Sequence, residues 1–168
     1  MKYARAAICL ITFLGLASVG QAQAIFPPLT VEDLNGRTVQ LPAQLPGEPT
    51  IVFIAFKQRQ QPNIDAWAQR LGLQQVGGPA WVEMPVVGRG AALMRPIIDN
   101  GMRSGITSEA MRARTFTLYS SRNAFMGALG LSSLRQVYVA LVNRDGSVRT
   151  IIAGDVTDAK VAQLRAAY

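Results

Sequence analysis

The segment Thr50–Phe56, which reads Thr-Ile-Val-Phe-Ile-Ala-Phe, constrains the fold more than any other part of the sequence. Seven consecutive residues that are mostly apolar and favour β-structure are typical of a strand buried on both faces, in the middle of a sheet. A polar stretch, Lys57–Gln61, follows, and Pro62 fits the first turn of a helix, where its missing N–H costs nothing. One apolar stripe at helical spacing comes next, made of Ile64, Trp67, Ala68 and Leu71. We therefore predict a buried strand, a polar turn and a helix over Asn63–Leu71.

The segments on either side of this unit predict a hairpin before it and mixed structure after it. Asn35-Gly36 is a strong two-residue turn signal between Leu29–Leu34 and Arg37–Leu41. After the helix we predict a strand over Ala80–Val87, which Pro85 places near a sheet edge or a strand end. A region with helical spacing follows, and we expect Pro96 near the start of a helix or at a kink.

The second half of the chain predicts three more strands, two of them in a hairpin, and two more helices. Thr115–Tyr119 has the composition of a short strand. The other predicted elements are a helix capped by Ser120 or Ser121 and ended by Gly130, antiparallel strands over Val137–Val142 and Ser147–Ile152, and a last helix capped by Thr157. The order predicts an α/β sandwich, with a central mixed sheet, helices on both faces and an N-terminal β-hairpin.

This order, together with the hairpin Leu34–Leu41 and the strand Thr50–Phe56, resembles the thioredoxin-like superfamily. In that superfamily the turn after the central strand holds the redox cysteines. Here Lys57–Gln61 holds none, and Leu131–Gln136 lacks the proline that thioredoxins place before their third core strand. The resemblance therefore implies a cysteine-free member with another role.

Four short motifs are similar to those of the mitochondrial ATP synthase assembly factor family and its bacterial relatives. They are Phe56-Lys57 with Asp65-x-Trp67, Gly101-Met102-Arg103, Thr117-x-Tyr119, and the run from Val137 to Gly146. This resemblance implies a chaperone-like protein rather than a catalytic one. On this basis we expect a protein that is not an enzyme.

The N-terminal residues have the pattern of a secretory signal peptide. Lys2 and Arg5 give a basic start, Ala6–Val19 is an apolar run, and Ala22-Gln23-Ala24 is a small-x-small cleavage site. We predict a signal peptide over residues 1–24 and one thioredoxin-like domain over 25–168, which places the protein in the periplasm. Retention of the apolar run as an anchor is the alternative.

The absence of two residue types excludes many reactions. The chain has no histidine, and Cys9, its only cysteine, lies within the predicted signal. Thiol–disulfide exchange, Cys/His zinc sites, haem ligation by histidine and Ser-His-Asp or Cys-His catalysis all need these residues. We expect no cofactor and no metal.

The charge of the predicted mature chain is positive, with fifteen basic and ten acidic residues once Lys2 and Arg5 are removed. The arginines are scattered, which favours a solvated surface, and weak attraction to an anionic membrane is the alternative. No basic helix with interleaved aromatic residues is present, so nucleic acid is not an expected partner.

The polar turn after the central strand is the candidate docking rim. Amide, ammonium and guanidinium donors gather there at a helix N-terminus, where anions are favoured. The candidate partner-binding residues are Lys57, Gln58, Arg59, Gln61, Trp67 and Arg103. Trp67 has a second interpretation, as a core residue on the apolar stripe. We expect Glu83 to point outward by strand alternation, and the ten scattered acids predict no convergent pair.

Three hypotheses follow, and surface shape separates them. A binding or assembly module for an envelope or membrane protein predicts an exposed apolar or arginine-rimmed patch. A small-ligand binder in the groove above Lys57–Pro62 and the Leu131–Gln136 loop predicts an enclosed pocket of a few hundred Å³. A thiol-independent enzyme predicts a carboxylate with a strongly perturbed pKa in a cleft.

Overall fold

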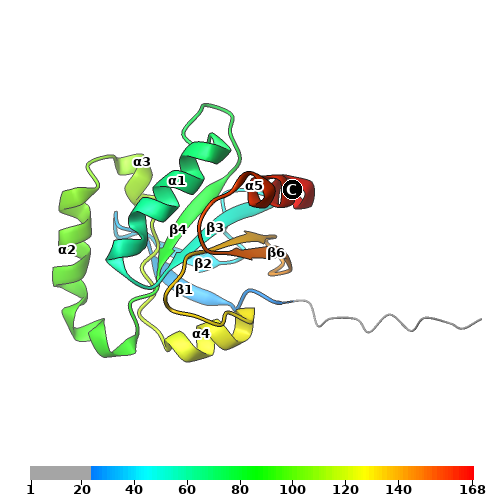
Figure 1. Ribbon diagram of the computed structural model, residues 1–168. Coiled ribbons are helices and arrows are strands. Elements are labelled where there is room, and N and C mark those ends of the chain that lie inside the picture. The colour runs from blue at the N-terminus through cyan, green and yellow to red at the C-terminus, as the bar shows by residue number, and fades with distance from the viewer. Residues whose placement is uncertain (1–23) are drawn as a thin grey trace, which may run out of the picture.

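A four-stranded mixed sheet forms the centre of the protein, whose computed structural model describes residues 24–168 (Figure 1). Strand β3 pairs in parallel with β4 and antiparallel with β5, and β5 pairs antiparallel with β6. The order across the sheet is β4 (Trp81–Pro85), β3 (Thr50–Ala55), β5 (Tyr138–Val142) and β6 (Val148–Ala153). As the sequence predicts, Thr50–Ala55 lies inside the sheet with every residue buried, and Pro85 ends an edge strand.

Helices cover both faces of this sheet, and each face has its own apolar core. On one face, α1 (Gln61–Leu71) and α5 (Asp158–Ala167) pack through Trp67 and Leu164 onto Phe53. On the other face, α4 (Arg122–Leu129) packs together with the N-terminal hairpin. Because β3 is covered on both sides, its continuous apolar sequence is what the fold requires.

The N-terminal hairpin consists of β1 (Leu29–Glu32) and β2 (Thr38–Leu41), which pair antiparallel in a separate two-stranded sheet. Its turn contains Gly36, whose φ of 83° is a conformation that glycine adopts without strain. The predicted fold class is confirmed in each of its parts: the mixed sheet, the helices on both faces and this hairpin.

Local signals set the ends of the helices. A short 3₁₀ turn, η1 (Gln58–Gln60), leads into α1, and Pro62 lies in the first turn of that helix. The side chains of Ser121 and Thr157 accept hydrogen bonds from Ala124 N and Lys160 N at the starts of α4 and α5, as predicted caps should.

The chain between β4 and α4 departs from the sheet and forms a separate wall. It contains η2 (Arg89–Met94), α2 (Arg95–Gly105) and α3 (Glu109–Arg112). Figure 1 shows α2 and α3 beside the sheet, with α1 between α2 and α5. The predicted strand Thr115–Tyr119 is not a regular strand, because only isolated bridges join it to its neighbours, such as Glu83 with Thr115 and Val86 with Leu118. The predicted signal peptide, apart from Ala24, lies outside the described residues, and within residues 24–168 no helix combines the length and apolar character needed to cross a bilayer.

Candidate functional site

A cavity of about 920 Å³ lies where the predicted rim meets the α2 wall. The end of β3 and the start of α1 form one side, β4 and the chain after it form the floor, and α2 with α3 forms the opposite side. Its lining is mostly apolar and includes Ile64, Ile98, Met102 and Met111. We call this cavity the α1–α2 groove.

Glu83 is a buried carboxylate in the floor of the groove. It lies in the middle of β4, is 6% exposed and has Phe53 as its partner in β3. The expectation that Glu83 points outward is wrong. Both faces of β4 are covered, so strand alternation turns Glu83 toward the side on which α1 packs and not toward solvent.

Glu83 shares a hydrogen-bond donor with a second carboxylate. Gln61 Nε2 donates to Glu83 Oε2 at 3.3 Å and to Asp65 Oδ1 at 3.1 Å. Burial raises the pKa of the Glu83 carboxyl; the bond from Gln61 opposes this change, and the negative charge of Asp65 adds to it. Sequence reasoning predicted no convergent pair of acids, and the fold brings these two together from α1 and β4.

The apolar lining continues beyond the groove onto exposed surface. Ile97 lines the groove and is 65% exposed, while Leu93 and Met94, just before α2, are 93% and 49% exposed. We call Leu93, Met94 and Ile97 the η2–α2 apolar strip. Exposed apolar side chains that adjoin a groove are typical of surfaces that bind another molecule.

Polar contacts, rather than an apolar face, hold the first half of α2. Its one buried residue is Asp99, whose Oδ1 accepts a hydrogen bond from Tyr119 Oη at 2.7 Å. Arg95 forms an ion pair with Glu32 of β1 at 2.8 Å and lies over the ring of Tyr119. Burial raises the pKa of the Tyr119 phenol, and the hydrogen bond to Asp99 raises it further, because both favour the neutral phenol.

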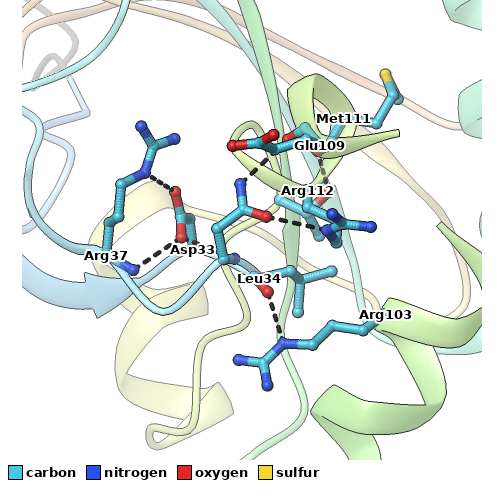
Figure 2. A network of polar contacts seen from close by, with 9 residues as sticks. Asp33, Leu34, Arg37, Arg103, Glu109, Met111 and Arg112 are labelled. Carbon is cyan, nitrogen blue, oxygen red and sulfur yellow. Dashed lines mark hydrogen bonds and ion pairs between the residues drawn. The ribbon is translucent and has the colours of Figure 1, made fainter. Parts of the chain in front are cut away.

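The second half of the wall is held by the turn of the N-terminal hairpin (Figure 2). Arg103 Nε donates to Leu34 O at 2.6 Å, and Arg112 Nε donates to the Asn35 side chain at 2.9 Å. Asn35 Nδ2 in turn donates to the carbonyl of Glu109. The buried carboxylate of Asp33 accepts a hydrogen bond from Arg37 Nε at 2.7 Å, and this ion pair fixes the shape of the turn. The hairpin therefore sets the position of α3 and of the end of α2.

Apart from Trp67, the predicted partner-binding residues separate into three groups. Lys57, Gln58 and Gln61 line the groove, as a docking rim requires. Arg59 is exposed but is not part of the lining. Arg103 belongs to the contact with the hairpin just described.

Trp67 is a core residue and cannot belong to an exposed rim. It is 0% exposed, and its indole N–H donates to the carbonyl of Gly154 at 3.0 Å. Its place on the apolar stripe of α1 explains this burial, because that stripe faces the sheet. The structure supports the interpretation of Trp67 as a core residue.

Gln60 has a structural role that sequence reasoning missed. Its side-chain oxygen accepts from Phe56 N at 2.7 Å and from Lys57 N at 3.0 Å, and its amide nitrogen donates to Leu134 O. Gln60 thus ties the turn to the Leu131–Gln136 loop. That loop does not line the groove, so the small-ligand hypothesis was wrong about the second side of its pocket.

The groove offers carboxylate, amide and ammonium groups in an apolar setting. Across residues 24–168, no three His, Cys, Asp or Glu side chains group as a metal site would require. The groove is larger and more open than the small-ligand hypothesis expects, and the adjoining apolar strip matches the binding-module hypothesis. Glu83 is a carboxylate in the groove whose pKa is raised by burial, which is the direction that the enzyme hypothesis allows for an acid in a cleft.

Among the comparisons with known proteins, the one with solved structures supports the fold. No protein-family model and no curated protein matches the chain. BsSco, a member of the Sco family of cytochrome c oxidase assembly proteins, is similar in structure, with a TM-score of 0.58 and 15% identity over 87% of this chain and 94% of its own. The exposed lipoprotein thioredoxin of Streptococcus pneumoniae TIGR4 gives 0.53 and 12% identity over 82% and 97%. The chain therefore has the thioredoxin-like fold.

One expectation has to be corrected in the light of these neighbours. A thiol–disulfide oxidoreductase from Bacteroides fragilis has a similar structure, with a TM-score of 0.50 and 9% identity over 86% of this chain and 99% of its own. The expectation that the protein is not an enzyme is therefore wrong, because oxidoreductases are built on the same fold. The only cysteine of this sequence, Cys9, precedes the described residues.

Proposed function

We propose that this protein is a binding module of the cell envelope, which holds a segment of another envelope protein in the α1–α2 groove during assembly. The observation that carries the proposal is the groove together with the η2–α2 apolar strip that continues from it. Such a role needs no cysteine in the turn after β3.

The shape of the apolar surface favours an elongated occupant. A compact ligand within the groove would leave Leu93, 93% exposed, without a contact. A polypeptide segment can fill the groove and also lie along the strip, as helices and extended peptides do in other apolar grooves. The exposed Lys57 and Gln58 at the edge of the groove supply the polar rim that such interfaces have.

Two further observations support an assembly role in the envelope. BsSco belongs to a family of assembly proteins, and its structure is similar to this chain over most of the length of both. The N-terminal pattern of residues 1–24 is that of an exported protein. The motif resemblance to the ATP synthase assembly factor family points in the same direction. The excess of basic residues adds a weak, salt-sensitive attraction to anionic membrane surfaces.

In-cell photocrosslinking tests the proposal. A photoreactive residue replaces Gln58, which lines the groove, and mass spectrometry identifies the captured protein. Gln74 is the matched control, since it is an exposed glutamine beyond the other end of α1 and outside the lining. We expect one dominant envelope protein from position 58 and not from position 74. Equal capture at both positions, or none at 58 in the folded and exported protein, would contradict the proposal.

A second candidate function is acid–base catalysis on a molecule held in the groove, which the pairing of Glu83 with Asp65 favours. A panel of model esters, glycosides and phosphoesters is the test. Turnover that the Glu83→Gln substitution abolishes would support this function. No turnover in a protein that captures a partner at position 58 would leave binding as the function of the groove.

A further inference from the structure

We infer that Glu83, in the floor of the α1–α2 groove, and Asp65, on its α1 side, form a cation-recognition site, so that the bound segment carries a lysine or arginine among apolar residues. The inference rests on the proposed function, because it names a feature of the molecule that the groove holds. The observation behind it is the buried carboxylate of Glu83.

Glu83 has less hydrogen bonding than a buried carboxylate ordinarily has. At 6% exposure, it receives one hydrogen bond, from the Gln61 amide to Oε2, and no donor within residues 24–168 serves Oε1. Buried carboxylates are usually paired with a cation or with several donors, since an uncompensated charge in an apolar setting is costly. Because Glu83 lines the groove, the donor that it lacks can arrive with a ligand.

Two of the cations that lie close to Glu83 in the fold, Arg122 and Arg114, contact other groups. Arg122, which also lines the groove, donates to the carbonyls of Val86 and Val87. Arg114, beside Glu83 across the bridge to Thr115, holds its guanidinium over the ring of Trp81. Lys57 lies at the edge of the groove, and across the described chain Glu83 takes part in no ion pair. The protein thus carries an excess of cations and supplies none to this carboxylate.

The second carboxylate makes the site more negative. Gln61 Nε2 is shared between Glu83 Oε2 and Asp65 Oδ1, so among the described residues a single neutral amide links the two acids. A cation between them would be attracted by both, and most strongly by Glu83, because burial of that carboxylate limits its contact with water whereas Asp65 is exposed. The walls, which include Ile64 and Met102, suit the methylene stem of a lysine or arginine side chain.

Fluorescence anisotropy with two labelled nonapeptides tests the inference. Both peptides have leucine flanks, and the central residue is lysine in one and norleucine, which has a similar length without the charge, in the other. We expect the native protein to bind the lysine peptide about tenfold more tightly, as a charge-assisted hydrogen bond would give. Glu83→Gln is expected to remove this preference, so that the lysine and norleucine peptides bind with similar affinity.

The outcomes separate this inference from the proposed function. Equal binding of both peptides by the native protein would overturn the cation site and leave the groove as a binding site. Absence of saturable binding for either peptide would overturn both. The comparison of peptides on the native protein decides the matter without a variant. Glu109→Gln, at an exposed acid outside the lining, is the control and is expected to keep the tenfold preference.

Discussion

Helices α1 and α2 make an instructive pair, because they have the same length and the same kind of start but opposite environments. Each has eleven residues and a proline in its first turn. Helix α1 buries Ile64, Trp67 and Ala68, whereas the one buried residue of α2 is Asp99. One helix belongs to the apolar core, and the other is a wall held mainly by polar contacts. The groove exists because the two helices differ in this way.

The difference also predicts where the molecule opens most easily. Regions with few buried apolar contacts unfold locally at lower free energy than core elements do. Helix α2 meets this description, since Ile97 and Leu93 stay exposed while Asp99, Arg95 and Arg103 hold the helix in place. A wall of this kind can adjust to an occupant without disturbing the sheet.

The largest expected effect comes from removing the anchor of α1. Trp67→Ala deletes a fully buried indole and its hydrogen bond to Gly154, and is expected to lower the free energy of unfolding by about 3–5 kcal/mol. The matched change on the other helix, Ile97→Ala, removes an exposed side chain and is expected to change it by less than about 0.5 kcal/mol. Denaturant unfolding measures both. Equal losses of unfolding free energy in the two variants would contradict the difference between the two helices.

The next effect comes from the polar anchor of α2. Asp99→Ala removes the acceptor for Tyr119 Oη and is expected to cost about 1–3 kcal/mol, confined to local opening. Amide hydrogen exchange over Arg95–Gly105 should then be roughly tenfold faster or more, with no change over Gln61–Leu71. Tyr119→Phe removes the same bond and should act in the same direction. Equally faster amide exchange in α1 and α2 would contradict the conclusion that α2 opens separately from the core.

Glu83 predicts a pH-dependent contribution to stability. Burial raises its folded-state pKa above the ordinary value of 4.5, so the folded protein holds the proton more tightly than the unfolded chain does. Stability is therefore lost as pH rises from about 4.5 through the folded-state value. Glu83→Gln cannot ionise and is expected to be more stable than the native protein near pH 8, with a smaller difference near pH 4.

Thermal unfolding across this pH range measures the effect. The control is Glu109→Gln, which removes an exposed carboxylate. Its plot of unfolding temperature against pH is expected to run parallel to that of the native protein. If the plot for Glu83→Gln is also parallel to that of the native protein, burial does not raise the pKa of the Glu83 carboxyl.

A further pair of effects comes from filling space beside each helix. No atom lies within 4 Å of a Cβ built at Gly101 of α2, and the residue is helical, so Gly101→Ala is expected to stabilise the protein by about 0.5–1 kcal/mol. Ala68→Leu adds carbons on the buried side of α1 and is expected to cost about 1–3 kcal/mol. Denaturant midpoints measure both, and a loss of stability in Gly101→Ala would mean that the groove is not open at this point.

The elements that could be predicted from the sequence are those fixed by local chemistry. Asn35-Gly36 sets a hairpin, the continuous apolar run of β3 requires a central strand, and the stripe on α1 requires a covered face. Ser121 and Thr157 cap helices within their own segments. None of these depends on how distant parts of the chain meet, which is why their positions follow from the sequence.

The parts that escaped prediction depend on tertiary contacts. Glu83 is buried because α1 and the chain after β4 cover its side of the strand, which strand alternation alone does not reveal. Asp65 and Glu83 come from different elements and meet only through Gln61. Lys57, Gln58 and Gln61 could be placed beside the groove from the sequence because they follow the central strand directly, whereas the opposite wall depends on contacts from Arg103 to the hairpin.

Blocking the groove tests the central claim most directly. Gly101→Trp places an indole at a position that lines the groove, and Gly127→Trp places one at a helical position of α4 that has equally open space and lies outside the lining. Both variants are combined with the photoreactive residue at position 58. We predict that Gly101→Trp abolishes capture of the envelope partner and that Gly127→Trp leaves it unchanged. Undiminished capture in a folded Gly101→Trp protein would show that the partner does not occupy the groove.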